Sequence, residues 1–266
     1  MSEVELVRDE QGGVTVMVDG QPQSHVDVDD PEGLAFEYVQ HLAAAIDALT
    51  EGTITITHVG GAGLTLARWV EHTRPGSPQI VLEPDAAFTE IVRRELPLPR
   101  RHRIRVRPVD GRSGVAALRD DSADVVVVDA FANGQVPSEL TTREFFGEVA
   151  RVLTAQGVLL VNTPDEPGLK HVGRVLAGIR EVLPEVTLVA TTEVLKGRRF
   201  GNTILVGSRR PVDTDEIARQ VRRWPFPSGV LGARELTRRF SGSRSLTDAD
   251  PAPSPVAPEL GAWRLR

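Results

Sequence analysis

The stretch TITITHVGGAGLTLARWVEH, residues 53–72, combines a strand pattern, a glycine-rich turn and a helix pattern. Residues 53–57 alternate polar and apolar side chains, and LTLARWVEH has the apolar spacing of an amphipathic helix. Three glycines, Gly60, Gly61 and Gly63, lie between the two patterns. Glycines at such a turn let the backbone approach a ligand closely, and the first amides of the helix face that ligand. The stretch therefore predicts a strand–turn–helix unit that binds a nucleotide.

The rest of the chain continues this alternation of strand and helix patterns. The strand patterns are residues 53–59, 79–83, 103–108, 124–130, 157–162, 186–191 and 202–208. The run VVVV at 125–128 is apolar on both faces, which is typical of a parallel strand covered on both sides. We expect an α/β fold with a Rossmann-like, doubly wound, mostly parallel seven-stranded sheet. No convincing helix precedes the last strand, so it could insert antiparallel at or next to the edge.

Two segments flank this predicted sheet domain, which we place at residues 31–225. Residues 1–30 show short alternating strands and turns, typical of a small N-terminal β-hairpin region. Residues 241–266 are rich in Pro, Ser and Ala and poor in aromatic side chains, which predicts a disordered tail. Deleting that tail is expected to leave the melting temperature almost unchanged.

Composition excludes several classes of protein. The 266 residues carry a net charge of −6, which argues against the basic face of a nucleic-acid binder. Because cysteine is absent, disulfides, thiolate nucleophiles and cysteine-ligated zinc are excluded, and the six scattered histidines suggest no metal site. No run of about eighteen apolar residues predicts a membrane span. The start of the sequence lacks the pattern of a secretory signal, so we expect a cytoplasmic protein.

Acidic residues follow three of the predicted strands at the edge where the glycine turn lies. Glu83, Asp110 and Asp129 end or follow strands two, three and four. In an open parallel sheet, ligands bind beyond the carboxyl ends of the strands. Glu83 comes about twenty residues after the glycines, a spacing that suits a carboxylate on a ribose diol. Each acid alone is better explained as a helix cap or a solvated loop residue, but together at one edge they predict a nucleoside site.

The glycine turn also indicates which nucleoside to expect. From Gly61 the chain continues GAGLTLA, so Leu66 stands where a dinucleotide turn has its third glycine, and Ala67 comes one residue late. The Gly-Lys-Ser/Thr of a P-loop is absent. An additional acid after strand three could accept a hydrogen bond from an adenine amino group. These features favour S-adenosylmethionine or a relative over NAD.

From about Val14 to Ser208, the chain resembles the spermidine synthase (polyamine aminopropyltransferase) family. Five motifs carry this resemblance in the family's order: VDGQPQSHVDVDDPEGLAFEYVQH (18–41), HVGGAGLTL (58–66), LEPD (82–85), VDGRSGV (109–115) and VVVVDAFANGQVPSELTTREFFGEV (125–149). The resemblance implies a class I methyltransferase fold with a small N-terminal β domain. It also implies transfer of an aminopropyl group from decarboxylated S-adenosylmethionine, or a relative, to an amine in polyamine biosynthesis.

The resemblance also implies roles for the strand-end residues. Glu83 would hold the ribose hydroxyls, and Asp110 with Gly111 would hold the adenine. Asp129 stands where the family has its catalytic aspartate, which takes a proton from the attacking amine.

Three residues of the N-terminal motif complete the predicted site. Gln23, Glu37 and His41 match positions at which the family faces the amine and the nucleoside. We expect Gln23 and Glu37 on the substrate side and His41 on the nucleoside side. On the sequence alone, His41 is better explained as a helix residue half-covered by the β domain, and Glu37 has the alternative of an exposed helix acid.

Four residues depart from the family's pattern. Gly63 replaces the aspartate of the glycine loop, Ala35 and Phe36 replace a tyrosine and a histidine, and Ala132 replaces a second aspartate. The lost groups belong mainly to the part of the site that holds a diamine.

Three hypotheses therefore stay open. The first is an aminopropyltransferase that uses Asp129 as base, and the second is a methyltransferase acting on a less cationic acceptor. The third is a nucleoside-binding protein without catalysis. In each case we expect small-molecule ligands and neither nucleic acid nor membrane as partner, with a homodimer left open.

Overall fold

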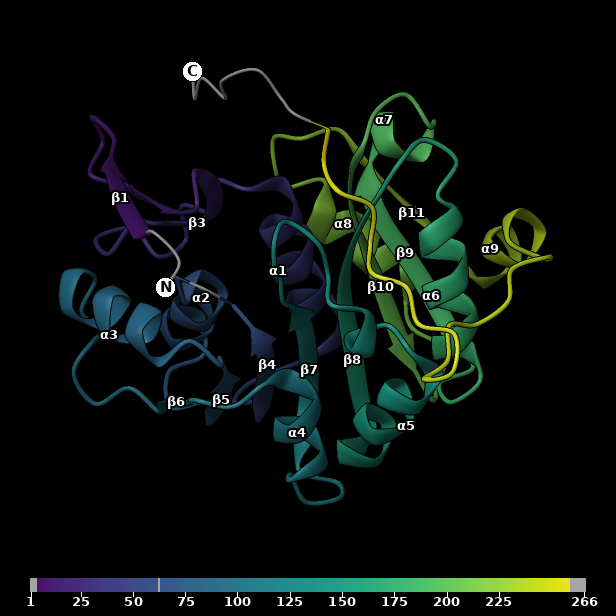
Figure 1. The fold of residues 1–266 in the computed structure, drawn as a ribbon, viewed down its shortest axis with the longest axis horizontal. Coiled ribbons are helices and arrows are strands. Elements are labelled where there is room, and N and C mark those ends of the chain that lie inside the picture. Colours follow the sequence, from purple (N-terminus) through teal and green to yellow (C-terminus); the bar gives the residue numbers. More distant parts are fainter. Residues whose placement is uncertain (1–3, 62, 259–266) are drawn as a thin grey trace.

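An eight-stranded sheet runs through the centre of the protein, and helices cover both of its faces (Figure 1). The computed structural model describes residues 4–61 and 63–258. In spatial order the strands are β11 (Ser228–Leu231), β9 (Glu185–Thr191), β10 (Gly201–Ser208), β8 (Leu153–Asp165), β7 (Ala123–Asp129), β4 (Ile56–Gly60), β5 (Gln79–Leu82) and β6 (Ile104–Arg107).

The strand directions confirm the predicted doubly wound, mostly parallel sheet. β8, β7, β4, β5 and β6 are parallel to their neighbours, and β10 inserts antiparallel between β8 and β9. The sequence predicts seven strands, and the structure adds β11, which pairs antiparallel with β9 at the edge. β11 was missed because its four residues, SGVL, are too short to show a period.

The helices form two layers. On one face lie α1 (Glu37–Leu49), α2 (Thr65–Thr73) and α8 (Thr214–Val221), and on the other lie α4 (Gly111–Ala116), α5 (Arg143–Val152) and α6 (Lys170–Arg180). Three further helical elements are η1 (Ser138–Leu140), α7 (Thr192–Leu195) and α9 (Ala233–Arg239). None of the helices in the described residues is long and apolar enough to cross a membrane.

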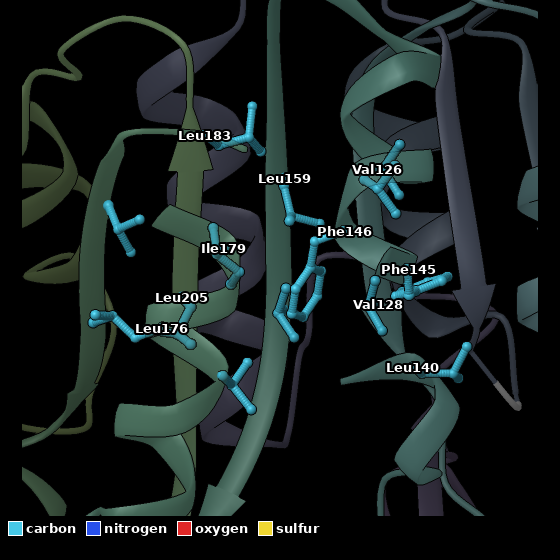
Figure 2. Close-up of a cluster of buried hydrophobic side chains, with 14 of the residues drawn as sticks. Val126, Val128, Leu140, Phe145, Phe146, Leu159, Leu176, Ile179, Leu183 and Leu205 are labelled. Atoms are coloured by element: carbon cyan, nitrogen blue, oxygen red, sulfur yellow. The ribbon is translucent and has the colours of Figure 1, made fainter. Parts of the chain in front are cut away.

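Alternation along β7 distributes its valines between the two layers. Val125 and Val127 pack against the α1 layer, whereas Val126 and Val128 pack against the α5 layer. Figure 2 shows Val126 and Val128 beside Phe145 and Phe146 of α5. All six side chains of this group are almost fully buried. Truncating one such phenylalanine to alanine typically costs about 3–5 kcal/mol of stability.

The N-terminal region is a separate three-stranded antiparallel sheet. It consists of β1 (Val4–Arg8), β2 (Val14–Val18) and β3 (Gln21–Val26). Val14, Val16 and Val26 pack against Phe88 and Val92 of helix α3 (Ala86–Glu95). This packing attaches the small sheet to the parallel edge of the large one, next to the glycine turn.

The prediction that residues 241–266 are disordered is wrong for residues 241–258. This segment, here called the strap, runs beside α6 without helix or strand, apart from a turn between Thr247 and Asp250, and is yellow in Figure 1. Leu246 and Ser254 are fully buried, and ion pairs join Asp248 to Arg112 and Asp250 to Arg174. Composition hides these contacts because a few isolated anchors fix a segment that is otherwise polar and rich in proline. Residues 259–266 lie outside the described part of the chain.

Candidate functional site

The turn between β4 and α2 adopts a backbone that requires glycine. Gly60 and Gly61 have φ angles of +80° and +113°, in the region that side chains disfavour. A Cβ on Gly60 would lie 2.4 Å from the carbonyl oxygen of Asp129 and 2.7 Å from Cα of Ala130. A Cβ on Gly61 would meet no atom within 4 Å. The turn thus presses against the end of β7 on one side and is open on the other.

Strand β3 occupies the space beside Gly63. The Gly63 N–H donates to Oγ of Ser24 at 2.9 Å, and Oγ1 of Thr65 donates to the carbonyl of His25 at 2.9 Å. A Cβ on Gly63 would lie 2.8 Å from Cβ of Ser24 and 3.0 Å from a methyl group of Val26. An aspartate at this position would require β3 to move. The small N-terminal sheet therefore explains why this chain has glycine at position 63.

A small pocket lies between the glycine turn, the start of α1 and the end of β7. The residues that contribute to its lining include Ser24, Tyr38, His58, Gly60, Gly61, Leu64 and Asp129. Its wall is largely apolar, and Asp129 brings the carboxylate. A partly apolar cleft with one perturbed carboxylate, at the carboxyl edge of a parallel sheet, is typical of a ligand site.

Asp129 has few hydrogen-bond partners. Nδ2 of Asn162 on β8 donates to Oδ1 of Asp129 at 2.9 Å, and Oδ2 has no partner among the described residues. Burial raises the pKa of the carboxyl to about 6, and the Asn162 bond offsets part of that rise. Burial, together with the nearby charge of Asp129, raises the pKa of the Tyr38 phenol. The free oxygen is available to a ligand, and the carboxylate is more basic than an ordinary aspartate.

Glu83 and Asp110 lie at the same edge of the sheet but do not line this pocket. Oε1 of Glu83 accepts the Asp85 N–H at 3.1 Å, and burial raises the pKa of Glu83. Oδ1 of Asp110 accepts the Ser113 N–H at 2.8 Å, which lowers the pKa of Asp110 and makes it the N-cap of α4. Both residues keep a second carboxylate oxygen, so their predicted roles in nucleoside binding stay predictions.

Gly111 allows α4 to approach β4. A Cβ on this residue would lie 2.3 Å from a methyl group of Val59. The structure thus gives Gly111 a packing role, and its contact with adenine stays a prediction.

Glu37 forms an ion pair with an arginine 162 residues later in the sequence. Nη2 of Arg199 lies 2.6 and 2.8 Å from the two carboxylate oxygens of Glu37 and also donates to Oγ1 of Thr191 at 3.0 Å. Glu37 begins α1, directly before Tyr38 of the pocket. The glutamate is therefore close to the site in sequence, but its charge is already compensated.

His41 and Gln23 lie away from the pocket lining. His41 is buried, its Nε2 is 2.8 Å from Oγ of Ser228 on β11, and burial lowers its pKa to about 4. Gln23 precedes Ser24 at a β-bulge in β3, where Val16 pairs with Ser24 and Met17 pairs with Pro22. Ser24 lines the pocket, whereas Gln23 is not among the lining residues. The ligand-binding roles of both residues stay predictions.

Four residues that contact Asp129 or line the pocket were not predicted from the sequence. They are Ser24, Tyr38, His58 and Asn162. The buried His58 has its Nε2 2.9 Å from Oε1 of Gln79, and burial lowers its pKa to about 4. Asn162 had a signal in the sequence, since it is the polar end of the apolar run GVLLVN beside the strand that ends in Asp129. Within the described residues, no cluster of His, Cys, Asp or Glu is arranged to hold a metal ion.

Comparison with known proteins decides the family. No family model matches the sequence. The crystal structure of a probable spermidine synthase from Corynebacterium glutamicum is 31% identical, and the match covers 93% of each chain with a TM-score of 0.86. The chain belongs to the spermidine synthase family. This match confirms the family membership that the sequence motifs predict.

More distant spermidine synthase family members agree with this assignment. A polyamine aminopropyltransferase of Chromobacterium violaceum is 27% identical over 165 residues, which are 61% of this chain and 62% of that protein. The chain thus aligns with less than two thirds of the length of this curated relative. A spermidine synthase solved in complex with the transition state analogue AdoDATO is 17% identical with a TM-score of 0.63, which shows a shared fold.

Proposed function

We propose that the protein is a transferase that binds an S-adenosyl nucleoside and transfers an aminopropyl group to an amine, a reaction of polyamine biosynthesis. The observation that carries this proposal is the Asp129 carboxylate beside the glycine turn, which has a pKa of about 6 and one oxygen that no described residue binds. Family membership supports the reaction type. The AdoDATO complex of a relative supports a decarboxylated S-adenosylmethionine as donor.

The residues present fit such a donor. Gly61 is open on its pocket side, Leu64 and other apolar side chains line the wall, and Glu83 keeps one carboxylate oxygen for ribose hydroxyls. When bound, the donor supplies an electrophilic methylene next to a sulfonium.

Asp129 performs the proton transfer in this mechanism. The amine arrives as an ammonium, and its proton passes to the free Oδ2 of Asp129. The nitrogen lone pair then forms the new C–N bond as the C–S bond breaks, and the electron pair of that bond stays on sulfur to give methylthioadenosine. A carboxyl pKa of about 6 makes Asp129 a stronger base than a solvated aspartate while keeping it mostly ionised at neutral pH.

The acceptor is proposed to carry a single ammonium instead of two. Arg199 neutralises Glu37, and position 132 is an alanine. A second ammonium without a carboxylate partner would cost several kcal/mol if it were buried. We therefore propose a monoamine, or an amine with an uncharged or acidic far end. Cytoplasmic location remains part of the proposal, with no role for nucleic acid or membrane and with a homodimer left open.

Methyl transfer is the second candidate, because Gly63 and Ala132 remove acids that a diamine requires and a methyl donor does not. Calorimetry with methylthioadenosine, S-adenosylmethionine and its decarboxylated form separates the hypotheses. Aminopropyl transfer predicts a preference for the decarboxylated donor. Equal or better binding of S-adenosylmethionine would favour methyl transfer, and no binding of any of the three would leave a protein without this activity.

A further inference from the structure

The loop directly after Asp129, residues 130–137, contains a tight turn. Ala132 and Gln135 exchange backbone hydrogen bonds of 2.8 and 3.1 Å. Between them, Asn133 and Gly134 have φ angles of +51° and +74°. Asn-Gly with both residues in the left-handed region is typical of a type I′ turn. The loop therefore has a defined internal shape, but its position relative to the sheet needs outside contacts.

Ser254 of the strap supplies those contacts. The Val136 N–H donates to Oγ of Ser254 at 2.9 Å, and the Ser254 N–H donates to the Val136 carbonyl at 3.3 Å. Nε2 of Gln135 donates to the Ser254 carbonyl. In the described part of the chain, these bonds and the turn from Pro137 to Leu140 are the hydrogen bonds that residues 131–137 make outside the loop.

The strap is itself fixed along its path to this loop. The Leu246 carbonyl accepts the N–H of Arg143, at the start of α5, at 2.9 Å, and its side chain is fully buried in the core. Further along, Asp250 pairs with Arg174 of α6 at 2.5 Å. Ser254 is thus presented by a segment anchored on two helices, and the burial of its hydroxyl keeps water from replacing it.

We propose that Ser254 is a positioning residue: through the strap it holds the loop 130–137 and thereby sets the place of Asp129. This inference rests on the proposed function for its effect on turnover, whereas its effect on the loop does not. Asp129 and the loop are directly consecutive, and Ala130 packs against the glycine turn, so a shift of the loop displaces the carboxylate. A misplacement of about 1 Å can lower a rate by about a hundredfold.

The test compares two strap variants of the full chain. Ser254→Ala removes the hydroxyl that binds the Val136 N–H. Asp250→Asn is the matched control, because it weakens the strap on α6 and leaves the loop contact in place. Hydrogen exchange of residues 131–136 reports the loop, the NMR titration of the Asp129 carboxyl reports its surroundings, and kcat with methylthioadenosine affinity reports function.

We expect Ser254→Ala to raise loop exchange at least tenfold, shift the Asp129 titration and lower kcat about tenfold with methylthioadenosine affinity unchanged. Asp250→Asn should keep all four quantities within about twofold of the wild type. Unchanged loop exchange and Asp129 titration in Ser254→Ala would overturn the proposal. Faster loop exchange with an unchanged titration and kcat would also overturn it, since Ser254 would then serve stability alone. If the wild type shows neither binding nor turnover, the proposed function fails, and the exchange and titration results still decide the role of Ser254.

Discussion

The carboxyl ends of β7 and β8 are neighbours in the sheet and end in aspartates with very different surroundings. Asp165, at the end of β8, is buried, and its two oxygens accept the N–H groups of Glu166 and Val172, each at 2.8 Å. Asp129, at the end of β7, accepts the side-chain amide of Asn162 on one oxygen and lines the pocket. Burial raises the pKa of both. An aspartate at the end of a strand therefore stabilises the fold when backbone amides bind both of its oxygens. It can bind a ligand when they do not.

The largest effect on stability is expected at the end of β8. Asp165→Ala leaves the N–H groups of Glu166 and Val172 without their charged acceptor at the start of α6. The two hydrogen bonds to this charged group contribute about 1.5–3 kcal/mol each, and the cost of burying the carboxylate offsets part of their sum. We therefore expect a loss of about 2–4 kcal/mol in the free energy of unfolding. Urea denaturation measures it. A loss below about 0.5 kcal/mol would contradict the claim that Asp165 stabilises the fold.

Glu83 extends the comparison to the end of β5, where one oxygen accepts the Asp85 amide and the other has no partner among the residues that the structure describes. Glu83→Ala should weaken methylthioadenosine binding by about 1.5–3 kcal/mol while the protein stays folded. Calorimetry measures the affinity and thermal melting serves as control. Unchanged affinity in a folded variant would refute the ribose assignment.

Some features of this site can be predicted from the sequence, and others cannot. Apolar runs and the glycine turn predict the parallel sheet and place Asp129 at its edge, because strand period and strand ends are local signals. The pairing of Glu37 with Arg199, 162 residues apart, is not visible in any local pattern. Nor are the anchors Leu246 and Ser254, since each is a single buried residue in a polar, proline-rich segment. Contacts between segments that are far apart in the sequence become visible only in the folded structure.

A pH titration of stability sharpens the comparison further. The folded pKa of Asp129, about 6, lies above its ordinary value of 3.8, so folding favours the protonated form. The stability this group contributes is present below about pH 4 and is lost as the pH rises through 6. Between pH 4 and 7, the stability difference between Asp129→Asn and the wild type should therefore shift by about 2–3 kcal/mol in favour of the variant. A difference that stays constant over this range would contradict the raised pKa.

The smallest effect concerns the acceptor side. Arg199→Ala frees Glu37, and the loss of a partly exposed ion pair should cost at most about 1 kcal/mol of stability. With the glutamate released, use of a diamine acceptor should improve several-fold, mainly through KM, whereas a monoamine should react as before. The double variant Arg199→Ala with Glu37→Gln is the control and should lose that gain. Equal diamine kinetics in all three proteins would show that Glu37 does not face the acceptor.

Turnover and thermal melting of Asp129→Asn, measured on one preparation, test most directly whether Asp129 is the base. Asparagine keeps the shape and still accepts the hydrogen bond from Asn162, but it cannot take a proton from the amine. Turnover with any amine acceptor should fall about a hundredfold or more, with methylthioadenosine affinity unchanged and the melting temperature equal or higher at neutral pH. Full activity in this variant, or a lower melting temperature with turnover retained, would contradict the account.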